Sequence, residues 1–201
     1  MKNKSFAIWI SLFVGLSGCA IRDHTPVSTY TLNPAPAAVG QSEGSERNAA
    51  STLMLGQIRS SRAFSCEDII YTDPQYGQNS YTYSCWSDSP TRMLLLILQE
   101  ALEKSGQFKA VVPYSSLSQA DLLLESTLFD LSHRINEDGT SDGIIKVHFN
   151  LVNIKTRKVI ASQEIASSVQ VATKNAEGAV AALNKAASLV TQDLIDWLGS
   201  L

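Results

Sequence analysis

The feature that most constrains this chain is a strict alternation of apolar and polar side chains over residues 145–151, which read IKVHFNL. Successive side chains of a strand point to opposite faces, so this pattern predicts a strand with one face buried, as in antiparallel sheets. A second apolar-rich segment precedes it, and a third runs from Val159 to Val171 after the basic turn 155–158. The C-terminal half is therefore expected to contain three consecutive antiparallel strands.

The preceding segment is expected to be a longer strand that begins at Leu122. A strand that keeps period 2 throughout presents alternate residues to each face. One face is then expected to carry Leu122, Leu124, Leu128 and Asp130, and the other Leu123, Phe129 and Leu131.

Two helices accompany the strands. Pro90, with Ser89 as its N-cap, begins a helix whose leucines recur at helical spacing and which stops at Gly106. An apolar stripe over residues 176–197 predicts a C-terminal helix. Further strands are expected at 28–32, 52–58, 66–72, 80–86 and 108–113. The fold class is α+β: an antiparallel-dominated mixed sheet with two helices packed on one face. Because apolar helix faces serve interfaces as well as cores, a homo-oligomer is also possible.

The N-terminus has the pattern of a cleaved secretory signal. Two lysines precede an apolar run over residues 6–16, which is too short to span a bilayer. The run ends in Leu16-Ser17-Gly18-Cys19, which matches the bacterial lipobox. We therefore expect residues 1–18 to be a lipoprotein signal peptide and Cys19 to carry diacylglycerol and an N-acyl chain such as palmitate. No other cofactor is expected.

Ala20 follows the cysteine, where an aspartate would favour retention in the inner membrane. The expected location is the outer membrane, facing the periplasm. Residues 19–51 are rich in Pro, Ala, Gly and Ser, which predicts a lipidated flexible tether. Residues 52–201 are then expected to form a single α+β domain.

The charge balance is mildly acidic. Without the two lysines of the signal, 14 of the 16 basic residues remain, against 19 acidic ones. A chain without a basic stripe is a poor candidate for binding nucleic acid.

Cys66 and Cys85 flank a segment dense in turn residues, which predicts a β-hairpin. If its turn centres between Gln75 and Tyr76, the two cysteines lie directly opposite, at a separation that a disulfide can span. An oxidising periplasm favours that bridge. The alternatives are two free buried cysteines and, with less support because no partner lies at ligand spacing, a metal site.

No catalytic or metal site is evident, and we expect no enzyme. His24 lies in the tether, and His133 and His148 lie in strands, where a cross-strand pairing into a metal or acid–base site is the less favoured reading. Residues 136–143 resemble a calcium loop only loosely, and a solvated hairpin loop is the better interpretation. Phosphate-cradling loops, Cys-x-x-Cys and His-Glu-x-x-His are all absent from the sequence.

Aromatic residues concentrate in and around the predicted hairpin. Tyrosine and tryptophan pack in cores, but when exposed they are also the residues that interfaces use. The hairpin is thus the best candidate for partner binding, through Tyr71, Tyr76, Tyr81, Tyr83 and Trp86.

The order of these features resembles a known family. The lipobox is followed by Tyr30-Thr31-Leu32, a polar spacer and a strand, then Ile70-Tyr71 and Trp86-x-x-x-Pro90. The helix continues into Ser105-Gly106-Gln107-Phe108, and Ala120-Asp121-Leu122 follows. Over nearly the whole mature chain this is similar to the ABC-type transport auxiliary lipoproteins, the PqiC-like intermembrane transport lipoproteins.

That resemblance implies a non-catalytic outer-membrane subunit of a lipid transport system. Its partners would be an MCE-domain protein that bridges the periplasm and the subunits of an inner-membrane ABC transporter. The alternatives are an assembly or pilotin-like lipoprotein of another envelope complex and, with least support, a periplasmic enzyme.

Overall fold

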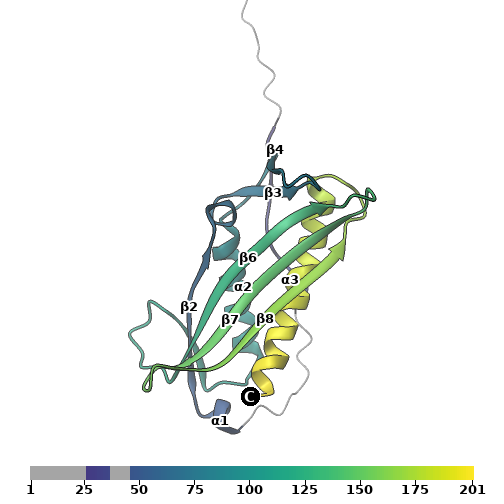
Figure 1. Cartoon of the computed structure of the whole chain (residues 1–201). Helices are drawn as coiled ribbons and strands as arrows, with labels where there is room; N and C mark the ends of the chain where they lie inside the picture. The colour runs from purple at the N-terminus through teal and green to yellow at the C-terminus, as the bar shows by residue number, and fades with distance from the viewer. Residues whose placement is uncertain (1–25, 37–45) are drawn as a thin grey trace, which may run out of the picture.

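The computed structural model describes residues 26–36 and 46–201. The signal peptide, Cys19, Ala20 and His24 lie outside these residues. In these described residues eight strands form one sheet, and the two long helices both lie against one of its faces (Figure 1). The elements are β1 (Ser28–Tyr30), α1 (Glu46–Ala49), β2 (Thr52–Ser60), a 3-10 turn (Arg62–Phe64), β3 (Asp68–Thr72), β4 (Gln78–Trp86), α2 (Pro90–Ser105), β5 (Ala110–Pro113), β6 (Leu122–Ile135), β7 (Ser141–Asn153), β8 (Lys158–Gln170) and α3 (Ala176–Gly199).

The α+β prediction is confirmed, and the predicted elements agree with the structure to within a few residues at most ends. The longest strand pairings of the sheet, β6 with β7 and β7 with β8, are antiparallel as expected. Pro90 begins α2 after Ser89, and Gly106 ends it in the left-handed conformation at φ 66°. The parallel pairings of β6 with β2 and β3 were not foreseen, because an alternating pattern tells which face is buried but not which strand is the neighbour.

Strand β6 organises the sheet. One of its edges pairs with β7 along the whole strand. The other edge pairs first with β2, from Leu122 to Leu128, and then with β3, at His133 and Arg134. Strands β2 and β3, both from the N-terminal part of the chain, thus pair with the same strand, β6.

A β-bulge at Phe129 corrects the expected faces of β6. Leu128 pairs with Val147 and Asp130 with Lys146, so Phe129 has no partner on β7. The extra residue shifts the alternation by one position. Leu131 therefore joins the buried face, whereas Phe129 is 54% exposed and Asp130 lies on the solvent side, paired with Arg134.

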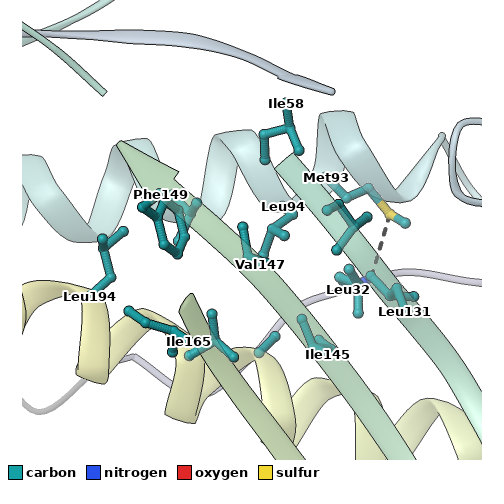
Figure 2. Packing of buried hydrophobic residues seen from close by; sticks show 14 of the residues in the cluster. Leu32, Ile58, Met93, Leu94, Leu131, Ile145, Val147, Phe149, Ile165 and Leu194 are labelled. Carbon is teal, nitrogen blue, oxygen red and sulfur yellow. Dashed lines mark hydrogen bonds between the residues drawn. The ribbon is translucent and has the colours of Figure 1, made fainter. Parts of the chain in front are cut away.

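The core lies between the sheet and the two helices. Figure 2 shows Leu94 of α2 and Leu194 of α3 facing apolar side chains of β7 and β8. Helix α3 buries more than the predicted stripe, including Ala182, Ala187 and Leu198, because it contacts both the sheet and α2. The apolar faces of the helices thus serve the core, and self-association through them stays untested.

Two buried amides hold the end of α3. Asn48 Nδ2 donates to the carbonyl of Leu198, and Gln107 Nε2 donates to that of Ile195. These bonds tie α1 and the connection between α2 and β5 to the last turns of α3. No helix in the described ranges, 26–36 and 46–201, has the length and apolar character needed to cross a bilayer.

Residues 28–36 contact the region expected to form the domain, residues 52–201. Strand β1 pairs in parallel with β4, so the strand expected at 28–32 is present. Leu32 is 5% exposed, and its backbone N–H lies 3.5 Å from Met93 Sδ of α2 (Figure 2). We call residues 31–36 the strap.

Gly143 of β7 sets how closely α3 approaches the sheet. A Cβ at this position would lie 2.9 Å from Ala182 Cβ and 3.0 Å from Leu183 N. We expect Gly143→Ala to lower the free energy of unfolding by about 1–3 kcal/mol, because it overpacks a rigid contact. Urea denaturation would measure the change. Ala166→Val, at an exposed position of β8, is the control and should leave stability nearly unchanged; equal effects would contradict the packing argument.

Substituting Leu32 tests whether the strap belongs to the folded unit. Leu32→Ala removes a buried side chain, so we expect a loss of about 2–3 kcal/mol in urea unfolding. Pro36→Ala, an exposed position of the same strap, should have little effect. Stability unaffected by Leu32→Ala would mean that the strap is not held by the core.

Candidate functional surfaces

The structure separates the five aromatic candidates into packed and exposed ones. Trp86 is 1% exposed and belongs to the core. Tyr81 packs against the core, and its ring lies 5.2 Å from that of Tyr71. Only two of the five project into solvent: Tyr76, which is 99% exposed in the β3–β4 turn, and Tyr83, which is 54% exposed on β4. The candidate binding surface of the hairpin therefore narrows to these two side chains.

The pairing register predicted for the hairpin is wrong. At its tip Tyr71 pairs with Asn79, but a bulge intervenes and Asp68, not Cys66, lies opposite Cys85. Cys66 precedes β3, and both cysteines are half-buried free thiols in the structure. The argument from opposed positions therefore no longer supports a disulfide.

His133 is buried at the end of β6 and pairs with a tyrosine. Its Nδ1 lies 2.6 Å from the hydroxyl of Tyr81, and its Nε2 is buried without a hydrogen-bond partner. Burial lowers the pKa of His133; the carboxylate of Asp142 opposes this and the ammonium of Lys174 reinforces it. Burial also raises the pKa of Tyr81. Both side chains are thus held neutral at pH 7.

The other histidine candidate lies elsewhere. His148 pairs with Thr127 on one side and with Glu164 on the other, whereas His133 pairs with Gly143. The two histidines are therefore not cross-strand neighbours. In the described part of the chain no three His, Cys, Asp or Glu side chains gather as metal ligands would.

The loosely calcium-like segment is the β6–β7 turn. Asn136 Nδ2 donates to Thr140 Oγ1 and to Asp142 Oδ2, and Thr140 donates to Asp138. The two bonds from Thr140, the one from its side chain foremost, lower the pKa of Asp138. The carboxylates thus serve the turn itself, as expected for a solvated hairpin loop.

The strap runs alongside α3 and also lies near α2. Asn33 N donates to Asn184 Oδ1 at 2.5 Å, and two residues further Ser188 Oγ donates to the carbonyl of Ala35 at 2.8 Å. A cavity of about 180 Å³ lies between the strap and the two helices. Sequence reasoning missed this contact because Asn-Pro-Ala-Pro has the composition of a linker; the buried Leu32 was the available signal.

A second surface lies where β7 turns into β8. Its residues combine positive charge with exposed apolar side chains, and we call them the basic edge: Lys155, Arg157, Lys158, Val159 and Ile160. Val159 and Ile160 are 57% and 48% exposed. Among the described residues β8 pairs with β7 alone, so its other edge offers unpaired backbone groups. The sequence indicated only a turn here.

The family model of the ABC-type transport auxiliary lipoprotein component matches residues 30–194, from β1 into the last turns of α3. The chain belongs to this family. The match confirms the family resemblance drawn from the sequence, and the lipobox at residues 16–19 lies outside the matched residues. It makes the protein an auxiliary lipoprotein of a transport system.

Solved structures share the fold of this auxiliary lipoprotein. Protein XCC0632 from Xanthomonas campestris is 17% identical, with a TM-score of 0.73 over 85% of this chain and 94% of that one. A second, uncharacterised protein is 14% identical, with a TM-score of 0.64 over 86% and 99%. No curated protein matches the sequence.

Burial of His133 predicts a pH-dependent stability. The pKa of His133 in the folded protein lies below its unfolded value near 6.5. Below about pH 7 the unfolded chain therefore binds more protons than the folded one, and the free energy of unfolding decreases as the pH is lowered. We expect the free energy of unfolding to drop between about pH 7 and 5. His133→Gln should flatten this slope in urea titrations at each pH. His148→Gln, at a half-exposed position, should retain it; the opposite pattern would contradict the assignment.

Proposed function

We propose that this auxiliary lipoprotein is a non-catalytic outer-membrane subunit that docks a periplasm-spanning MCE and ABC-type lipid transport system at the membrane. The observation that carries the proposal is the family match over residues 30–194, which describes an accessory component of an ABC transporter. The MCE partner is supported by the resemblance to PqiC-like proteins.

Attachment to the membrane would occur through Cys19. Leu16-Ser17-Gly18-Cys19 supplies the thiol at the position that lipoprotein processing uses, and Ala20 favours onward sorting to the outer membrane. A diacylated and N-acylated cysteine holds a protein firmly, because each buried methylene contributes about 0.8 kcal/mol.

The proposed docking site is the basic edge. None of its three cations takes part in an ion pair of the described residues, so their charge is available to a partner. In this turn the side-chain oxygen of Asn153 accepts a hydrogen bond from the backbone N–H of Thr156. The next residue, Arg157, adopts the left-handed conformation, with φ 57°. The basic edge places positive charge beside exposed Val159 and an unpaired strand edge. A partner with an acidic surface could therefore bind here by adding a strand to β8.

The non-catalytic role is supported by the way the buried polar groups are used. His133 and Tyr81 bond to each other, and Asn48 and Gln107 cap α3. These hydrogen bonds connect separate elements of the fold.

Affinity capture tests the function and the docking site together. We expect the tagged wild-type lipoprotein, captured from detergent-solubilised envelopes, to recover an MCE-domain protein and ABC transporter subunits in mass spectrometry. The double variant Lys155→Glu/Arg157→Glu should reduce that recovery about tenfold or more, because it places like charges opposite the acidic partner.

The control variant Arg62→Glu/Lys185→Glu makes the same change in net charge at exposed positions away from the basic edge. It should recover partners as the wild type does. Equal loss in both variants would reject the basic edge as the docking site. Recovery of a secretin, a pilus component or an outer-membrane barrel instead of transporter subunits would reject the transport function in favour of an assembly role.

A further inference from the structure

The strap fixes the end of the domain from which the N-terminal chain leaves. Asn33 bonds to Asn184 and Ala35 bonds to Ser188, so the strap follows α3 toward its C-terminus. The residues before the strap therefore lie toward the start of α3. There β1 joins β4, beside the β3–β4 hairpin and the β6–β7 turn, at the end opposite the C-terminus (Figure 1). We call this the hairpin end.

Chain length then limits where a lipid on Cys19 can be. Eight residues, 20–27, separate Cys19 from Ser28. Even fully extended they reach about 30 Å, and as a flexible coil about 16 Å. The 24 residues of α3 alone span about 36 Å between the two ends of the domain. A lipid on Cys19 therefore cannot lie at the end that carries the C-terminus.

The hairpin end also presents exposed aromatic side chains. Tyr76 is 99% exposed and has φ 65°, a backbone region that non-glycine residues rarely adopt. Its backbone N–H donates to the carbonyl of Asp73, so the turn sets this conformation, while the side chain itself extends into solvent. Tyr83 is 54% exposed and precedes Ser84, the partner of Ser28. Tyrosine is enriched at the level of lipid headgroups.

We propose that the hairpin end rests on the bilayer to which Cys19 is anchored, with Tyr76 and Tyr83 in the headgroup layer. The proposal rests on the lipidation of Cys19 but is independent of the transport partner. Acidic side chains are in the majority around the two turns, so the fitting surface is zwitterionic rather than anionic: Asp73, Glu137, Asp138 and Asp142 against Arg134 and Lys174. The basic edge then faces away from the membrane, into the periplasm.

Headgroup quenching tests this orientation. The mature lipoprotein carrying Cys66→Ser and Cys85→Ser would receive one fluorescent label, through Tyr76→Cys or through Leu117→Cys. Leu117 is fully exposed in the β5–β6 loop toward the opposite end and is the matched control. Each protein is reconstituted into vesicles of phosphatidylcholine and phosphatidylethanolamine that contain a nitroxide-headgroup lipid.

We expect the label at position 76 to lose about half its fluorescence or more, and the label at 117 to lose about a tenth or less, because only the first lies at headgroup level. Equal or reversed quenching would overturn the orientation while leaving the affinity capture result intact. The same labels on a chain that begins at Ala20 should show no quenching. Quenching of that unanchored chain at position 76 would overturn the role of the tether.

Discussion

Strand β6 is the element on which the rest of the structure depends, because both of its edges are hydrogen-bonded. It collects β2 and β3 on one side and β7 on the other, so the N-terminal strands and the C-terminal three-stranded unit form one sheet. The bulge at Phe129 keeps Leu131 on the same buried face of the strand as Leu122, Leu124 and Leu128. Without that shift Leu131 and His133 would face solvent.

Much of the fold could be predicted because local signals agree with the tertiary structure. The alternation in β7, the proline and glycine that bound α2 and the apolar stripe of α3 each indicated the correct element. The bulge at Phe129 and the register shift in the β3–β4 hairpin could not be predicted. The first depends on one inserted residue in β6 and the second on three extra residues in β4, and an odd number of inserted residues reverses the faces of everything beyond it.

The functional surfaces were harder to predict than the fold. Aromatic residues marked the right hairpin, but only burial distinguishes Trp86 and Tyr81, which pack, from Tyr76, which does not. The basic edge was visible as a charge run, yet its importance depends on β8 lying at an edge of the sheet. The strap was hidden because its contacts with Asn184 and Ser188 are more than a hundred residues distant in sequence.

The pairing of β1 and the burial of Leu32 have a consequence for mechanical load. Tension between a membrane-anchored N-terminus and a bound partner would enter the fold at Ser28 and act along β1, parallel to β4. Hydrogen bonds between parallel strands pulled in this direction are strained together rather than one after another. Leu32, which follows β1 and is buried beside Met93, would have to leave the core before the chain could be pulled out further. The N-terminal segment is therefore joined to the core twice, by a parallel strand pair and by a buried side chain.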